Sequence, residues 1–255
     1  MKYSLVIILS LLFLNCKQEK TEPLSAQTII DNSIEISGGE LIASSTIDFD
    51  FRDKHYKAFR NNGAFILDRE FIDMTSKYFD TITNVKDVIN NNGFQRFVND
   101  FPITVEDSMV PRYSASVNSV HYFSVLPFGL NDLAVNKELL DDVSIKGQNY
   151  YTIIVTFNQD GGGEDFEDEF MYWINYETHT LDYLAYSYNE SDGKGIRFRE
   201  AYNVRHIEGV RFVDYNNYKP ENTAVKLTDL PQLFENGTLK LLSKIELENI
   251  TVTPN

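Results

Sequence analysis

The arginines and histidines are the first residues of this chain that could do chemistry. Arg52 and Arg199 are notable because cations are few in this sequence. It has 23 Lys and Arg against 38 Asp and Glu, which gives a net charge of −15. His55 lies close in sequence to Asp50 and Asp53, which could orient it as a general base. The sequence contains no GxSxG elbow, HExxH pair or phosphate-binding loop to accompany it. We therefore predict no catalytic residue and no cofactor.

Arg199 belongs to an aromatic strand pattern in which alternate residues face opposite sides. Glu200 shares one side with Phe198, so a buried charge there needs a partner. One interpretation is a structural ion pair; another is the polar end of a ligand cavity, where an arginine binds a carboxylate or phosphate head group. The candidate ligand-binding residues are Arg52, His55, Tyr186, Arg199 and Tyr202.

The densest charge feature is the acidic, glycine-rich segment 158–168. Oxygen ligands on such a loop suit Ca²⁺, which takes about six to eight of them. Asp160, Glu164 and Asp165 are the calcium candidates. Their spacing matches no EF-hand loop, so a solvated hairpin tip is the favoured interpretation and no metal site is predicted.

Cys16 is the only cysteine in the sequence, and it ends an apolar run, residues 5–14. The run is too short for a membrane span of about 20 residues and has the length of a signal-peptide core. The pattern resembles a bacterial lipoprotein signal, although Asn15 and Phe13 depart from the usual residues before the cysteine. We expect residues 1–15 to be a signal peptide, Cys16 to carry lipid and residues 16–24 to be a tether. An ordinary secretory signal is the alternative.

Composition limits the remaining function classes. The negative charge repels phosphate backbones, so no nucleic-acid partner is expected. A single cysteine excludes an intramolecular disulfide and a thiolate zinc cluster. The mature chain lacks a Pro/Gly-rich linker, which predicts one domain over residues 25–255.

The elements that would position these residues are mostly strands. Helices are predicted over 25–38, near 84–91, and between Ser108 and Pro127. About ten antiparallel strands are predicted, over 47–51, 54–60, 64–72, 75–83, 140–146, 149–157, 171–175, 180–188, 195–204, 209–218 and 239–252. Asn61-Asn62-Gly63 predicts a hairpin turn. The resulting class is mainly β with α, a curved antiparallel sheet forming an unclosed barrel.

The many aromatic residues on these strands are either core fillers or the lining of an apolar cavity. Tyrosine hydroxyls facing inward are better placed at a cavity than in a dry core, and we expect an arginine near its edge. The tyrosines concerned are Tyr183, Tyr186, Tyr188, Tyr202 and Tyr215.

Three segments carry a resemblance to a known family: IIDNSIEISGG followed by STIDFDFRDKHY, then MYWINYETHTLDYLAYSY, then REAYNVRHIEGVRFVDYNNY. They resemble the LolA/LolB-like lipoprotein-localisation carriers, and more closely an uncharacterised group of Gram-negative bacterial lipoproteins. The resemblance covers about residues 26–252 and implies an unclosed barrel around helices that holds acyl chains. No functional residue of the carriers can be matched to this sequence.

The sequence therefore favours a lipid-anchored periplasmic binding protein that holds an apolar or amphipathic ligand, such as a lipid or acyl chain. We expect an outer-membrane lipoprotein facing the periplasm, with surface exposure as an alternative, and a monomer. The competing hypotheses are an envelope enzyme and a structural lipoprotein without a ligand. A hydrolase or an aldolase is the enzyme to consider, since some similar sequences carry an aldolase label.

Overall fold

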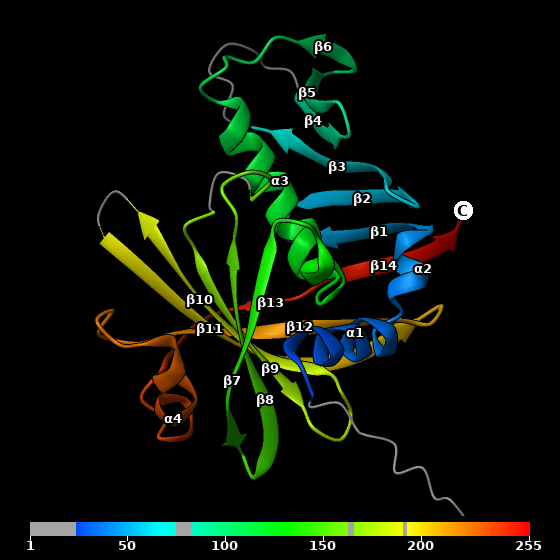
Figure 1. The fold of residues 1–255 in the computed structure, drawn as a ribbon. Helices are drawn as coiled ribbons and strands as arrows, with labels where there is room; N and C mark the ends of the chain where they lie inside the picture. Colours follow the sequence, from blue (N-terminus) through cyan, green and yellow to red (C-terminus); the bar gives the residue numbers. More distant parts are fainter. Residues whose placement is uncertain (1–23, 75–82, 163–165, 191–192) are drawn as a thin grey trace, which may run out of the picture.

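The computed structural model describes residues 24–74, 83–162, 166–190 and 193–255. Within them the chain forms four α-helices and fourteen strands in two seven-stranded sheets (Figure 1). All strand pairs are antiparallel, and neither sheet closes into a barrel. The predicted open, curved α+β fold is confirmed, with more strands than the ten or so expected.

Some sequence predictions lie outside the described residues. They are the signal peptide with Cys16, nearly all of the tether, most of the strand over 75–83, and the calcium candidates Glu164 and Asp165.

The first sheet has the order β14-β1-β2-β3-β4-β5-β6. Its strands are β1 (Ser45–Phe51), β2 (Lys54–Asn61), β3 (Ala64–Asp73), β4 (Thr83–Asn90), β5 (Gly93–Val98), β6 (Phe101–Ile103) and β14 (Glu248–Pro254). The predicted hairpin between β2 and β3 is present, and Asn62 and Gly63 both have the positive φ of a type I′ turn.

The helix predicted near 84–91 is wrong, because these residues form β4. Val85, Asp87 and Ile89 alternate along one face of the strand, but the charged residue in the middle hides the alternation. Asp87 is nevertheless fully buried, since its carboxylate is paired with two arginines. The two strands that follow, β5 and β6, were not predicted.

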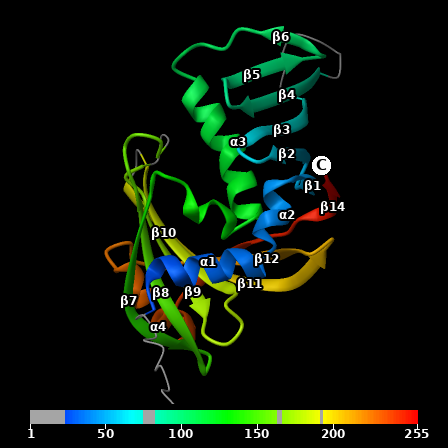
Figure 2. The same cartoon turned by 45° about the vertical axis from the view of Figure 1, so that its right-hand side comes forward.

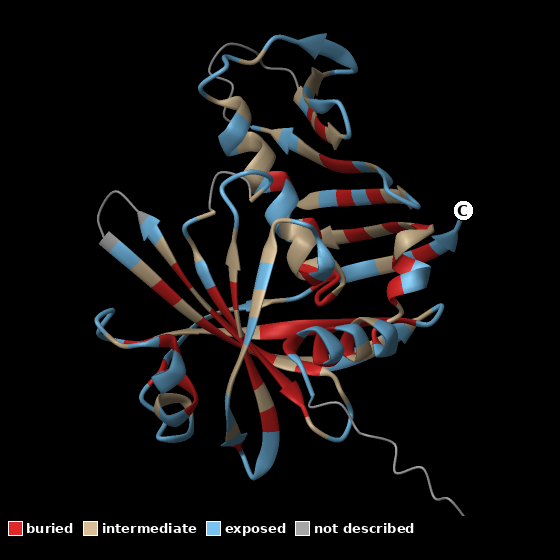
Figure 3. Ribbon diagram, in the orientation of Figure 1, coloured by how far each residue is buried: buried red, intermediate tan, exposed pale blue. Residues whose placement is uncertain are grey.

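The second sheet has the order β13-β12-β11-β10-β9-β8-β7. Its strands are β7 (Val135–Ile145), β8 (Gln148–Phe157), β9 (Glu169–Asn175), β10 (Leu181–Glu190), β11 (Gly193–Ile207), β12 (Val210–Lys219) and β13 (Lys240–Ile245). Helix α1 (Ala26–Ile36) covers one face, and α4 (Leu230–Glu235) lies on the other (Figures 1 and 3).

Burial on both faces explains the composition of the central strands of this sheet. On β9, Phe170 and Tyr172 pack in the core cluster that contains α1. Met171 and Trp173 pack in the opposite cluster with residues of α4. Six of the seven β9 residues are therefore buried, and the strand shows no polar alternation.

The single strand predicted over 239–252 is wrong, because the segment divides into β13 and β14, which belong to different sheets. The break falls at Glu246 and Leu247. The Leu247 backbone N–H donates to the Asp214 carboxylate at 3.0 Å, and Arg205 donates to both oxygens of the same carboxylate at 2.7 Å. Although burial raises the pKa of Asp214, these hydrogen bonds lower it below its usual value.

The N-terminal helix is two helices, α1 and α2 (Gly39–Ala43). Ser25 caps α1 as predicted, its hydroxyl accepting from the Thr28 N–H at 3.1 Å. Gly38 interrupts the helix with φ +83°, where a Cβ would lie 2.6 Å from the Gly209 carbonyl oxygen. Glycine is required here by both the backbone conformation and the close approach of β12.

Helix α3 (Val110–Ser124) fills the predicted position between Ser108 and Pro127 and lies against the first sheet (Figure 2). Arg69 of β3 donates to Ser116 Oγ at 2.7 Å and to the Asp87 carboxylate at 2.5 Å. Arg96 of β5 donates to the same carboxylate at 2.6 and 2.9 Å, and its guanidinium covers the Tyr113 ring at 3.7 Å. The buried Asp87 carboxylate on β4 thus joins β3 and β5, and Arg69 and Arg96 extend these contacts to α3.

The Asp87→Ala variant should lose about 3–5 kcal/mol of unfolding free energy, because it leaves two guanidinium groups without their counter-ion. Urea denaturation followed by circular dichroism measures the loss. The control is Asp53→Ala, which removes an exposed partner of Lys54 and should leave the urea midpoint unchanged. Equal midpoints for Asp87→Ala and the wild type would contradict the proposed importance of this carboxylate.

His121 also fixes α3 to the first sheet. It is 1% exposed, its Nε2 lies 2.9 Å from the Asp68 carbonyl oxygen, and its ring packs edge-on against Phe49 and Tyr56. Burial lowers the pKa of His121 to about 3, and the charges of Arg60 and Arg69 act in the same direction.

Acid should weaken the fold through His121. At His121 the unfolded chain binds a proton below about pH 6.5 and the folded chain does not. The stability that neutral His121 contributes to the folded state is therefore complete above pH 6.5 and is lost as the pH falls towards 3. Between pH 7 and pH 5 the loss from this group is about 2 kcal/mol. The difference in unfolding free energy between the two pH values, measured by urea denaturation, should be smaller for His121→Gln than for the wild type. Equal differences for the two proteins would contradict the assignment.

Candidate functional site

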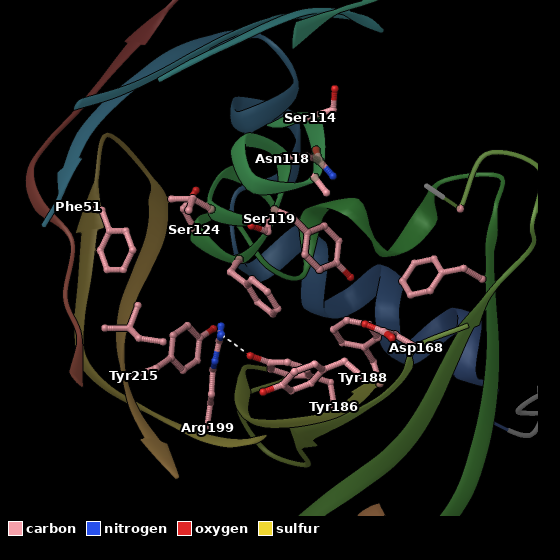
Figure 4. A pocket seen from close by; sticks show the side chains of 18 of the residues that line it. Phe51, Ser114, Asn118, Ser119, Ser124, Asp168, Tyr186, Tyr188, Arg199 and Tyr215 are labelled. Atoms are coloured by element: carbon pink, nitrogen blue, oxygen red, sulfur yellow. Dashed lines mark hydrogen bonds between the residues drawn. The ribbon is translucent and has the colours of Figure 1, made fainter. Parts of the chain in front are cut away.

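A cavity of about 740 Å³ lies between α3 and the second sheet (Figure 4). The volume falls within the range of small-molecule sites, about 300–1,000 Å³. Eight aromatic side chains of the described residues, from both sheets and from α3, line the cavity: Phe51, Tyr122, Phe123, Phe157, Phe170, Tyr186, Tyr188 and Tyr215.

The two faces of α3 explain why this space is not filled. Tyr113, Val117 and His121, spaced by four residues, point to the first sheet. Along the middle of the helix, the face towards the cavity carries small side chains, Ala115 and Ser119 among them, while Tyr122 and Phe123 near its C-terminal end reach the aromatic wall of the second sheet. Small residues opposite large aromatic ones leave a gap that ordinary core packing would close.

The cavity has exposed polar residues at its rim and buried residues in its depth. Asn118 and Ser119 of α3 line it and are exposed. Val213, Tyr215 and Arg199, from the floor formed by the second sheet, are buried. Burial raises the pKa of Tyr215 to about 12, so its hydroxyl stays neutral.

Arg199 is the buried cation of the cavity. It projects from β11 and is 7% exposed, deeper than the edge position predicted from the sequence. Its Nη2 donates to the Tyr186 hydroxyl oxygen at 2.7 Å, and its guanidinium stacks over the Phe123 ring at 4.0 Å (Figure 4). Its Nε has no hydrogen-bond partner. None of the ion pairs within the described residues includes Arg199.

Tyr186 and Arg199 are the two predicted ligand-binding residues that line this cavity. Tyr202 is not among the lining residues; its hydroxyl donates to Glu246 at 2.7 Å. Glu200, predicted to need a partner, accepts from Lys146 at 2.5 Å. The ion-pair interpretation therefore describes Glu200, whereas Arg199 has no such partner in the described part of the chain.

Arg52 and His55 lie in a separate cleft on the first sheet. His55 Nδ1 is 2.8 Å from Asp50 Oδ1, so the expected carboxylate partner is present. Hydrogen bonds from Asn249 and His55 lower the pKa of Asp50. The described residues of this cleft include no serine, threonine or cysteine beside His55, which leaves a general base there without a nucleophile to activate.

Sequence reasoning missed the contribution of α3 and β9 to the cavity, chiefly Phe123 and Phe170. It also treated the strand tyrosines as one group. Tyr186 and Tyr188 line the cavity, whereas Tyr183 packs in the opposite cluster with α4. The alternation of β10 carries this signal, because odd and even residues of a strand face opposite sides.

The described residues show few features of a metal or catalytic centre. Among them no three His, Cys, Asp or Glu side chains are grouped to hold a metal ion. Asp160 is exposed in the turn after β8. The cavity is lined by several serines but, within the described chain, by no lysine or histidine. None of the helices in this part of the protein is long and apolar enough to span a membrane.

A protein-family model matches residues 2–247. The chain belongs to DUF6503, a family of unknown function. No curated protein matches it. Membership in DUF6503 thus identifies the chain without assigning an activity.

Solved structures similar to this DUF6503 protein include a LolA superfamily protein from Nitrosomonas europaea, with 14% identity and a TM-score of 0.48 over 91% of this chain and 96% of that one. An outer membrane lipoprotein-sorting protein domain from Vibrio parahaemolyticus has 10% identity and a TM-score of 0.41, over 82% and 98% of the two chains. A DUF1329 family protein from Desulfovibrio piger has 8% identity and a TM-score of 0.38, over 89% and 92%.

Proposed function

We propose that this protein is a binding protein that holds an apolar or amphipathic ligand in the cavity between α3 and the second sheet. The observation that carries the proposal is the aromatic cavity of about 740 Å³ with an arginine in its floor. Concave apolar pockets with a few polar groups are the usual form of small-molecule sites. A wall of this size and composition fits a lipid or an acyl chain.

The alternatives receive less support. A structural lipoprotein needs no cavity, and a filled interior would be more stable. A Schiff-base aldolase needs a lysine and a hydrolase of the serine type needs a base near its nucleophile. Neither lysine nor histidine is found among the described lining residues, and His55 lies in the other cleft.

The proposal includes a lipid anchor at Cys16 that places the domain in the cell envelope, on the outer membrane and facing the periplasm. Its support is the apolar run that ends at the chain's only cysteine. A lipidated N-terminal cysteine carries more than one hydrocarbon chain, which is enough for stable anchoring. We propose that the domain acts as a monomer.

Ligand binding can be tested with the neutral fluorescent probe N-phenyl-1-naphthylamine on folded, delipidated protein. The wild type should bind it, and Ser119→Trp, which places an indole in the cavity, should weaken binding at least about tenfold. Fluorescence titration gives both dissociation constants.

The matched control is Arg112→Trp, an exposed position on the same helix that does not line the cavity. It should bind the probe like the wild type. Absence of probe binding by the wild type, or equal loss in both variants, would reject the binding function.

The anchor is tested by metabolic labelling with radioactive fatty acid in a Gram-negative host. Label should enter the wild type and be absent from Cys16→Ser, because only the thiol can form the thioether. Mass spectrometry of the mature protein should also show that residues 1–15 are missing. Equal labelling of both proteins would show that the lipid is not on Cys16.

A further inference from the structure

We infer that the ligand is a monocarboxylic acid with an apolar body, and that it binds with its carboxylate inward on Arg199. The inference rests on the proposed binding function and assigns the class and orientation of the ligand. It is carried by a buried guanidinium at the floor of the cavity that has no carboxylate partner within the described part of the chain.

Arg199 is buried without an anionic partner among the described residues. A guanidinium carries several N–H donors and cannot lose its proton, so burial without an anion is costly. The other buried arginines of the described chain have carboxylates: Arg69 is paired with Asp87 at 2.5 Å and Arg211 with Asp182 at 3.3 Å. Among the described residues, Arg199 contacts the Tyr186 hydroxyl and two aromatic rings and pairs with no carboxylate. The missing counter-ion is the feature that a ligand would supply.

The neighbours of Arg199 are able to help it bind an anion. Tyr186 accepts from Arg199, so its own O–H remains able to donate to an anion beside the guanidinium. Figure 4 shows both side chains on the floor of the cavity, with Tyr215 on the other side of the guanidinium. A carboxylate there would receive charge-assisted hydrogen bonds in an environment of low polarity, where they are strong.

The gradient of burial gives the orientation. Arg199 is 7% exposed, whereas Asn118 and Ser119 at the rim are exposed. An acid whose head group reaches the arginine must therefore enter head first. Its apolar body then lies between aromatic walls that include Phe51 and Phe170, and its far end meets the polar rim.

Charge balance favours a carboxylate over a phosphate monoester. One guanidinium neutralises one negative charge, and a phosphate monoester carries about −1.5 to −2 at neutral pH. The chain as a whole has a net charge of −15, so a dianion gains nothing from the surrounding field.

Three ligands with the same twelve-carbon chain test the inference: laurate, dodecanol and dodecyl phosphate, each displacing N-phenyl-1-naphthylamine from the delipidated wild type at pH 8. Laurate should bind at least about tenfold more tightly than dodecanol, the strength expected of charge-assisted hydrogen bonds. It should also bind more tightly than dodecyl phosphate. This comparison requires no variant.

Arg199→Gln should still bind the neutral probe, which shows that it is folded, and should bind laurate and dodecanol equally. Arg199→Lys, which keeps the charge but not the planar fork, should retain part of the preference. The control is Arg197→Gln, which changes the net charge equally, lies two residues away on β11 and is not a lining residue. It should keep the full preference for laurate.

Several outcomes would overturn the inference. Equal binding of laurate and dodecanol by the wild type would reject the carboxylate, while probe binding would leave the proposed function standing. Tighter binding of dodecyl phosphate than of laurate would show that the preferred head group is a phosphate and not a carboxylate. Loss of the preference in Arg197→Gln instead of Arg199→Gln would move the anion away from Arg199. If the wild type binds neither probe nor ligand, the proposed function itself fails.

Discussion

The buried carboxylate of Asp87 is the interaction on which the arrangement of the rest depends. It pairs with both Arg69 and Arg96 from the two strands on either side of β4, and Arg69 extends the contact to Ser116 of α3. A charge with 0% exposure is tolerated only because both partners are in place. The helix is thereby fixed on the first sheet by one face, and its opposite face is held towards the second sheet.

The cavity follows from this placement of α3. Tyr122 and Phe123, near the C-terminal end of the helix, already contact the aromatic wall. Without further restraint, the part of the helix that carries Ala115 and Ser119 would approach the second sheet as well, since packed interiors exclude large voids. Three contacts prevent that approach: the Arg69–Ser116 hydrogen bond, the His121 contact with Asp68, and the 2.9 Å hydrogen bond between the Tyr122 and Tyr172 hydroxyls. The last one joins the helix to the second sheet at a fixed distance. Polar contacts therefore define the width of an otherwise apolar space.

The sequence predicted most elements because their signals are local. Asn62-Gly63 specifies its turn and Ser25 caps its helix, and both are found where expected. The prediction failed where a distant residue decides the structure. The helix near 84–91 was inferred from Asn84 as a cap and Gly93 as a stop, and only the arginines of β3 and β5 explain why the charged Asp87 is buried on β4.

The candidate site also contains some residues that local sequence signals identify and others that only the tertiary structure brings together. Arg199 was identified because cations are few on this acidic chain and it lies in an aromatic strand, and Tyr186 because it lies in a tyrosine-rich segment. Phe123 and Phe170 could not be assigned to the same cavity, since nothing local relates α3 to β9. Arg52 and His55 were grouped with them on composition alone, whereas the topology places them on the first sheet, in another cleft.

The pairing of β1 with β14 has a consequence for how the chain reaches this state. Ser45 lies opposite Pro254, so the two strands of one ladder are separated by nearly the whole sequence. Contacts of such long range form late and slowly, because a large loop must close before they contribute. During synthesis the edge of β1 is left with unpaired backbone groups until β14 has emerged, and an exposed strand edge invites association with other chains. A chaperone that shields β1 until release would protect this protein at the step where it is most open to aggregation.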